Sequence, residues 1–423
     1  MSRVGRSVAT LLAAAALPWL AACTPQKSAA VAAPTPAPPT FDRMLADYDA
    51  AVASGEAATR ARLASAMVPL ELVSIYTERA RLTGGYDDYA RAEALLARIE
   101  TELRPSDELC LAKARLHFAL HRLARAKAVL DACPHVAGRP EDLALRADIA
   151  FYSGRYKDAG IIYRALVDRL GTPQAYTQLA LYSAKTGSPG EALAFFEAAE
   201  KRYHGTSPVQ LSWYALQRGL VEMDRGRFDE ARALFALADQ RMPGYWLNEE
   251  HLAEIAQLKG DDAAARRLYE AVVKKTTAPE YLDALAALET PEAARPLLDR
   301  AETIYDERAR RFPEAIAGHA LDHYLSAAPQ PARALSLAEA NFANRPYGDA
   351  AVALAKAYLM NGRAKEAQRL LDRQLAQGWD TAETWWTLAL AARAAGDPGR
   401  AKAAGDAALQ RNGQSASQYA FTF

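Results

Sequence analysis

The sequence lacks an excess of charge of either sign. Its 51 lysine and arginine residues balance 51 aspartate and glutamate residues, so the chain has no strongly basic field of the kind that binds nucleic acid. β-Branched residues are sparse, and no segment after the first 40 residues alternates polar and apolar side chains as a half-buried strand does. Alanine, the strongest helix former, is abundant instead. The composition therefore predicts an all-α protein.

Recognisable catalytic motifs are also missing. The chain contains no GxSxG nucleophile motif, no phosphate-binding Walker loop and no GxGxxG dinucleotide motif. The aspartates and glutamates scattered along the sequence are most simply explained as a solvated face. We therefore predict that the protein is not an enzyme and requires no cofactor.

Cysteine is rare, and the first of the three cysteines follows an apolar stretch near the amino terminus. Arg3 and Arg6 give the start of the chain a positive charge, and the apolar stretch covers residues 8–20. This stretch is shorter than the ~20 residues that span a bilayer. The small residues of the sequence LAAC then end at Cys23. Positive charge, a short apolar core and small residues at a processing site are typical of an export signal.

This segment resembles the lipobox of bacterial lipoproteins, in which the signal is cleaved before a cysteine that receives the lipid. The resemblance implies a signal peptide over 1–22 and a lipidated Cys23 that anchors the protein in a membrane. Thr24 is not the aspartate that retains many such proteins at the inner membrane of enteric bacteria. We therefore expect the outer membrane, facing the periplasm. A signal cleaved without lipidation, or a buried helix, is the alternative.

The Pro- and Ala-rich segment over 23–40 predicts an extended tether without a core of its own. A different pattern begins near Phe41. Apolar residues there recur at helical spacing and are interrupted by short turns that contain glycine or proline. We therefore place the folded part of the chain at 41–412, followed by a tail over 413–423. The aromatic residues of this tail could cap the apolar end of the array.

Glycines in these turns reveal a period. They stand at Gly154, Gly187, Gly226, Gly260, Gly362 and Gly396. Their spacings are 33, 39, 34, 102 and 34 residues, and 102 is three times 34. A small residue stands seven positions before each glycine, and an alanine stands five positions after it. Small side chains allow two antiparallel helices to approach closely, and glycine tolerates the positive φ of the turn between them.

This period and pattern resemble the tetratricopeptide repeat. The fullest unit covers Leu211 to Pro243, and the resemblance extends over about four-fifths of the chain, from Pro69 to Asn412. It implies a right-handed superhelical solenoid of nine or ten helix hairpins. Weaker units fall near 69–105, 107–138, 280–313 and 315–346. In this family the first helix of each hairpin lines a concave groove, and the usual function is binding.

The resemblance places a mixed set of side chains on or near the groove. These candidate partner-binding residues are Asp148, Tyr152, Lys185, Trp213, Glu250, Glu254, His319, His323, Lys356 and Trp386. The lysine and asparagine pair that clamps a terminal carboxylate in chaperone-binding relatives is absent from every unit. The aromatic members of the set fit the core between repeats at least as well as an anchor for a partner.

The two remaining cysteines, Cys110 and Cys133, fall at adjacent ends of one expected hairpin. Because the periplasm is oxidising, we predict a disulfide between them. Two buried free thiols are the alternative.

Histidine occurs as two i,i+4 pairs, His117 with His121 and His319 with His323. This spacing puts both rings of a pair on one helix face and can bind a transition metal. No HExxH motif and no obvious third ligand accompany either pair. A polar face or packed imidazoles is the simpler interpretation, and the second pair is the better candidate for contact with a ligand.

The sequence thus favours a lipid-anchored scaffold that binds a protein or peptide in its groove, in envelope biogenesis, secretion or export. A lipoprotein that binds a solute or metal through His319 and His323 is the alternative.

Overall fold

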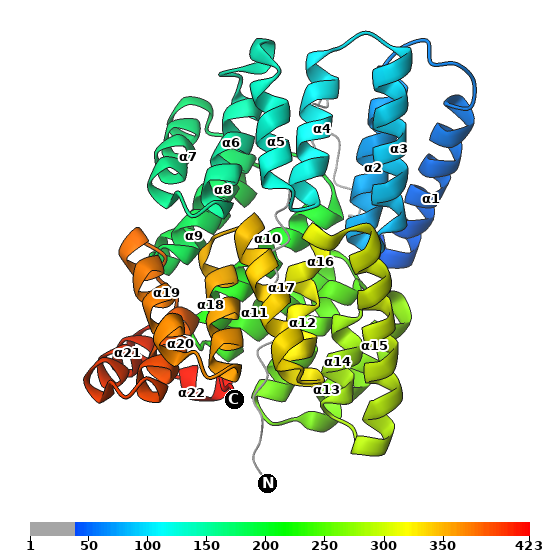
Figure 1. Ribbon diagram of the computed structural model, residues 1–423. Coiled ribbons are helices and arrows are strands. Elements are labelled where there is room, and N and C mark those ends of the chain that lie inside the picture. Colours follow the sequence, from blue (N-terminus) through cyan, green and yellow to red (C-terminus); the bar gives the residue numbers. More distant parts are fainter. Residues whose placement is uncertain (1–38) are drawn as a thin grey trace, which may run out of the picture.

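The polypeptide folds into a continuous series of antiparallel helix pairs (Figure 1). The structure is a computed structural model that describes residues 39–423. The proposed signal peptide, Cys23 and most of the proposed tether lie outside the described residues. Within them the regular structure is helical, apart from a single β-bridge between Thr186 and Asp380. The predicted all-α fold is confirmed, and the consecutive hairpins are those of a tetratricopeptide-like array.

Helix α1 (Phe41–Ala58) precedes the hairpins and packs against α2. The first five hairpins are α2–α3 (Met67–Thr83, Asp87–Glu102), α4–α5 (Asp107–Ala119, Leu123–Asp131), α6–α7 (Pro140–Tyr152, Tyr156–Leu170), α8–α9 (Pro173–Lys185, Pro189–Arg202) and α10–α11 (Pro208–Asp224, Phe228–Arg241). The next five are α12–α13 (Trp246–Leu258, Asp262–Lys275), α14–α15 (Glu280–Ala286, Pro291–Arg311), α16–α17 (Pro313–His319, Pro331–Asn344), α18–α19 (Gly348–Met360, Ala364–Gln377) and α20–α21 (Ala382–Ala394, Pro398–Arg411). A short 3₁₀ turn, η1 (Pro134–Val136), follows α5, a π-helical turn, η2 (His323–Ala327), follows α16, and the short α22 (Ser415–Gln418) ends the chain's helices. No helix within residues 39–423 has the length and apolar character needed to cross a membrane.

The turns and close contacts follow the repeat spacing. All six glycines of the repeat have positive φ, between 69° and 85°. Gly219 lies where α10 meets α11, and a Cβ atom there would stand 2.4 Å from the ring of Phe235. In the α4–α5 hairpin, which lacks the turn glycine, His121 adopts the left-handed conformation with φ 59°. A histidine at such a position carries backbone strain that glycine would not.

The array coils so tightly that its later hairpins pack on its earlier ones. Thr276 Oγ1 donates to the backbone oxygen of Thr83 over 2.9 Å, across 193 residues of sequence. Tyr156 Oη donates to Gln374 Oε1 over 2.9 Å, across 218 residues. In Figure 1 the yellow, orange and red helices of the second half lie mostly beneath the blue, cyan and teal helices of the first half. The superhelix therefore completes a turn and stacks upon itself.

Trp379 fills the joint between the stacked turns. It follows α19 and is completely buried. Its indole lies 5.6 Å from the ring of Phe151, 5.3 Å from Tyr156 and 5.8 Å from Tyr347, measured between ring centroids. A Cβ atom on Gly348 would stand only 2.1 Å from the indole. The aromatic cluster thus joins α6 and α7 to the start of α18, and glycine at 348 is the residue that leaves room for it.

The carboxyl-terminal tail turns towards the inner side of the superhelix. Ser415 Oγ donates to the backbone oxygen of Asn412, and Asn412 Nδ2 donates to Gln418 Oε1. Tyr419 is buried against this inner face, whereas Phe423 stays half exposed. The tail therefore supplies side chains to the interior of the superhelix, a position that differs from the predicted cap on the apolar end of the last hairpin.

Candidate functional site

Two adjoining cavities lie on the inner face of the superhelix. The first, which we call the aromatic cavity, has a volume of about 280 Å³ and is lined by Trp213, Leu216, Tyr245, Trp246, Tyr281 and the carboxylates of Glu250, Glu254 and Glu280, among others. The second, the charged cavity, has about 120 Å³ and includes Lys185, Asp224, Asp349, Lys356, Glu383 and Arg411. Glu254, Asp322 and Arg345 line both. The two cavities therefore form one continuous inner surface.

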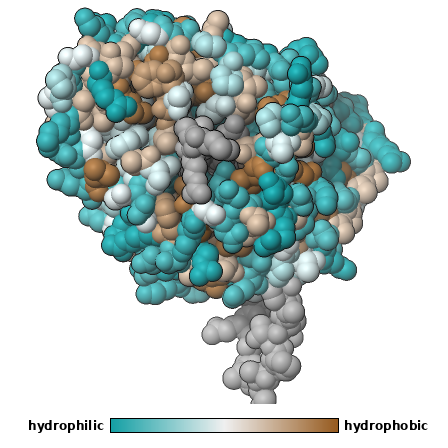
Figure 2. Space-filling model, turned by 90° about the horizontal axis from the view of Figure 1, so that it is seen from below, coloured by the Kyte–Doolittle hydropathy of each residue, from teal (hydrophilic) through white to brown (hydrophobic). Residues whose placement is uncertain are grey.

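The first helices of the hairpins build this surface. The aromatic cavity takes its lining from α2, α4, α10, α12, α14 and α16, and the charged cavity from α8, α18 and α20 in particular. Small residues on the facing sides of the hairpins allow the helices to pack closely, so that long polar and aromatic side chains project inwards. Figure 2 shows a hydrophilic edge around one face of the molecule, with hydrophobic residues gathered towards its middle.

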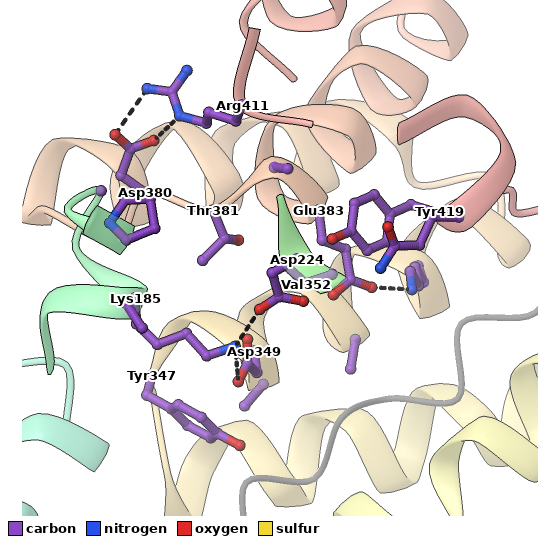
Figure 3. A pocket seen from close by; sticks show the side chains of 18 of the residues that line it. Lys185, Asp224, Tyr347, Asp349, Val352, Asp380, Thr381, Glu383, Arg411 and Tyr419 are labelled. Atoms are coloured by element: carbon purple, nitrogen blue, oxygen red, sulfur yellow. Dashed lines mark hydrogen bonds and ion pairs between the residues drawn. The ribbon is translucent and has the colours of Figure 1, made fainter. Parts of the chain in front are cut away.

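Buried ion pairs organise the charged cavity (Figure 3). Lys185 Nζ lies 3.5 Å from Asp349 Oδ2 and 3.9 Å from Asp224 Oδ2. Lys356 Nζ lies 2.6 Å from Glu383 Oε1. Burial alone would lower the pKa of Lys185, but the two aspartates raise it above its ordinary value. Burial raises the pKa of Asp224 to about 6, against the opposing effect of Lys185. These charges are paired within the chain, so the charged groups of this cavity already have partners of opposite charge without a bound ligand.

The aromatic cavity has a less balanced set of charges. On α12, His251 Nε2 lies 3.1 Å from Glu250 Oε1, and His251 Nδ1 lies 3.3 Å from Glu254 Oε2. Burial raises the pKa of Glu250, and the charge of Glu254 raises it further, although His251 acts in the opposite direction. Burial would lower the pKa of His251, but the two glutamates raise it. Two buried carboxylates thus share one imidazole.

Tyr269 lies on the neighbouring helix α13 and is completely buried. Burial raises its pKa well above the ordinary value, and the charges of Glu250 and Glu254 add to that shift. Its hydroxyl has no hydrogen-bond partner in the described chain. A buried, unpaired hydroxyl therefore lies on the helix that neighbours the two glutamates.

Six of the ten sequence-predicted residues line the cavities. Trp213, Glu250, Glu254 and His319 line the aromatic cavity, and Lys185, Lys356 and again Glu254 line the charged one. The other four are Asp148, Tyr152, His323 and Trp386, and neither cavity is lined by them. Asp148, Tyr152 and His323 contact neighbouring helices instead, and Trp386 packs against the hydrophobic core.

Contacts between repeats account for these positions. Asp148 accepts hydrogen bonds from Tyr163 Oη over 2.8 Å and from Gln178 Nε2 over 2.9 Å. Burial raises the pKa of Asp148 to about 7, and those two hydrogen bonds oppose the shift. Tyr152 packs edge-on against Tyr347 in the aromatic joint. Such residues therefore serve packing between helices, which is the alternative that the sequence left open for its aromatic candidates.

The paired histidines do not converge on a common site. His319 Nδ1 lies 2.7 Å from Glu280 Oε1, and the completely buried His323 has its Nδ1 2.7 Å from Asp283 Oδ1. Each ring is thus held by a different carboxylate. His121 stacks on His319 with ring centroids 6.0 Å apart, and burial lowers the pKa of His121 well below its ordinary value. Within residues 39–423 the second histidine pair gains no shared third ligand.

His251 is the site residue that the sequence reasoning missed. It stands between two predicted groove residues in the sequence EHLAE, over 250–254. The signal was the combination of a histidine with carboxylates one position before and three positions after it, on a groove-lining helix. His251 has no second histidine three or four positions away, so the i,i+4 pattern does not include it.

Cys110 and Cys133 are joined in a disulfide, with Cα atoms 6.6 Å apart. Cys110 lies in the first turn of α4, and Cys133 follows α5. The bond therefore ties the two open ends of the α4–α5 hairpin.

No protein-family model matches the chain, and no curated protein matches its sequence. Among solved structures, a chain of the APC/C hetero-tetramer Cut9–Hcn1 is 13% identical with a TM-score of 0.42, covering 89% of this chain and 80% of its own. The type IV pilus biogenesis factor PilW is 16% identical with a TM-score of 0.37, covering 49% and 96%. A thermophilic TPR protein of Thermus thermophilus is 20% identical with a TM-score of 0.34, covering 43% and 98%. The fold assignment rests on the chain's own hairpins.

Proposed function

We propose that the protein is a membrane-anchored scaffold that holds a segment of a partner protein on the inner face of its superhelix. The observation that carries this proposal is the aromatic cavity, which the first helices of six hairpins line with aromatic and aliphatic side chains beside a few polar groups. Concave apolar surfaces with convergent polar groups are the usual form of a binding site. The cavity has room for one or two large side chains of a bound segment.

Trp213 is the side chain we expect to anchor the partner. It is half-buried, it lines the aromatic cavity, and it lies edge-on to Phe196 and Tyr214. Tryptophan in a partly desolvated pocket is a frequent site of high binding energy. Leu216 and Trp246 line the same cavity and would add apolar surface around the partner side chain that contacts Trp213.

Attachment to a membrane through lipidated Cys23, on the periplasmic side of the outer membrane, belongs to the same proposal. The support for it is the sequence of the amino-terminal segment. A lipid anchor and a tether would keep the binding face near the membrane, where it could serve envelope biogenesis, secretion or export. The protein itself would carry out no catalysis.

Selection of peptides on the purified chain tests the proposal. A Cys23→Ser form, which cannot be lipidated, would be immobilised and used to select binders from a random peptide library. Selected peptides should bind Trp213→Ala at least tenfold more weakly, which corresponds to about 1.4 kcal/mol. Ile161→Ala is the matched control, because Ile161 is 58% exposed on the outer helix α7. Equal binding to both variants would contradict the proposal, as would a library that yields no binder.

A further inference from the structure

One cluster on the inner face has the composition of a metal site. Among residues 39–423, Glu250, His251 and Glu254 are the group of three whose ligand atoms all lie within 4.8 Å of one another. All three side chains come from helix α12 and line the aromatic cavity. Their exposed fractions are 3%, 5% and 5%. The cluster is therefore formed by one rigid helix and is shielded from bulk water.

A second observation shows that this cluster is incomplete as it stands. Glu250 Oε2 is buried and has no hydrogen-bond partner in the described chain. A buried carboxylate oxygen without a partner is costly, because it has lost its water and gained nothing in return. His251 offers one positive charge at most against two carboxylates. A divalent cation would supply both the missing contact and the missing charge.

The ligand types narrow the choice of cation. One imidazole nitrogen with two carboxylate oxygens suits zinc and its first-row neighbours better than calcium or magnesium, which prefer oxygen alone. Zinc lies about 2.0–2.2 Å from such atoms, so two ligands of one ion are separated by at most ~4.4 Å. The present separations of up to 4.8 Å need only small rotations of the side chains to reach this range.

We propose that Glu250, His251 and Glu254 bind one divalent transition-metal ion, of the zinc class, with an open coordination position facing the aromatic cavity. Three protein ligands leave a tetrahedral ion one position for water or another group. This site differs from the histidine pair suggested by the sequence, because its ligands converge and those of His319 and His323 do not. It lines the cavity in which we place a partner segment, but it requires no bound segment to take up the ion.

Metal titration of the full-length Cys23→Ser protein tests the site. After dialysis against a chelator, calorimetry with ZnCl₂ should give one ion per chain, and CoCl₂ should give the visible absorption bands of four-coordinate cobalt. His251→Ala should lower the affinity by about 100-fold or more. His319→Ala is the matched control, because His319 lines the same cavity but pairs with Glu280, and it should bind zinc as the unchanged protein does.

A second variant separates loss of a ligand from loss of the fold. Glu250→Gln removes the charged ligand and relieves the repulsion between the two glutamates, so it should remain folded by circular dichroism while losing zinc affinity at least tenfold. Zinc should raise the unfolding temperature of the unchanged protein and leave that of Glu250→Gln where it was. Absence of stoichiometric binding, or equal loss in His251→Ala and His319→Ala, would overturn the site.

Discussion

Replacing Trp379 with alanine should weaken the joint between the two stacked turns of the superhelix. The side chain is completely buried among three aromatic rings that belong to or adjoin α6, α7 and α18. Contacts of this kind hold residues of the first turn against residues of the second. Removing the indole would therefore leave each hairpin intact while loosening the way the turns sit on each other.

Two opposing contributions of the Trp379 side chain determine how much stability the alanine variant loses. An aromatic side chain of this kind buries roughly 150–250 Å², which at ~25 cal/mol per Å² stabilises the fold by about 4–6 kcal/mol. The indole nitrogen of Trp379 has no hydrogen-bond partner in the described chain, and such a buried group costs about 1–3 kcal/mol. Alanine removes both contributions. We expect a net loss of about 3 kcal/mol in the free energy of unfolding, at the lower end of the usual range for large aromatic truncations.

Urea unfolding and small-angle X-ray scattering would measure the two consequences. Trp379→Ala should unfold at lower urea concentration and show a larger radius of gyration before the unfolding transition. Trp379→Phe keeps most of the ring and removes the unpaired nitrogen, so it should lose less than ~1.5 kcal/mol. A loss below about 1 kcal/mol in Trp379→Ala, with an unchanged radius of gyration, would refute the idea that this residue joins the turns.

Three further changes test other parts of the fold. Gly348→Ala places a Cβ atom 2.1 Å from the indole of Trp379 and should destabilise the protein by about 1–3 kcal/mol, as measured by thermal unfolding. An unchanged midpoint would argue against close packing of this indole on the backbone at Gly348. Replacing Cys110 and Cys133 together by serine should cost about 3 kcal/mol in urea unfolding under oxidising conditions, and the same double variant should match the reduced parent. Burial raises the pKa of Asp148 to about 7, so this group remains protonated in the folded protein over a range where the unfolded chain is already ionised. Stability should therefore fall as the pH rises from about 4 to 7. The rise of the pKa from 3.8 to about 7 corresponds to about 4 kcal/mol, so Asp148→Asn should gain up to about 4 kcal/mol relative to the parent at pH 8 but little at pH 4. Equal stability changes at both pH values would contradict this assignment.

The fold within each hairpin could be predicted because the sequence repeats the residues that determine it. Gly219 lies where helix meets helix and Gly226 lies in the turn, and both occupy the positions that the 34-residue period assigned to them. The stacking of one superhelical turn on another could not be predicted in this way. It depends on Trp379 and Gly348, which belong to no repeated position, and Trp379 meets partners about 200 residues away in sequence.

The candidate site was predictable in part for the same reason. Trp213 and Glu254 belong to the first helices of their hairpins. The repeat therefore predicted that they lie on the inner face, as the structure shows. The spacing of His319 and His323 predicted that both rings share one helix face. In the structure each ring contacts a different carboxylate of α14, and only the fold shows where these carboxylates lie. His251 could be found only by a different pattern, which is a single histidine with two glutamates on one helix and no second histidine.

Photo-crosslinking in living cells tests most directly the claim that the inner face binds a partner. A photoreactive phenylalanine derivative would replace Trp213 in the aromatic cavity and, in a separate strain, Ile161 on the outer surface. We expect a discrete crosslinked protein from position 213 and none from position 161, with the crosslinked peptide of the partner identified by mass spectrometry. Crosslinks from position 161 alone, or from neither position, would contradict it.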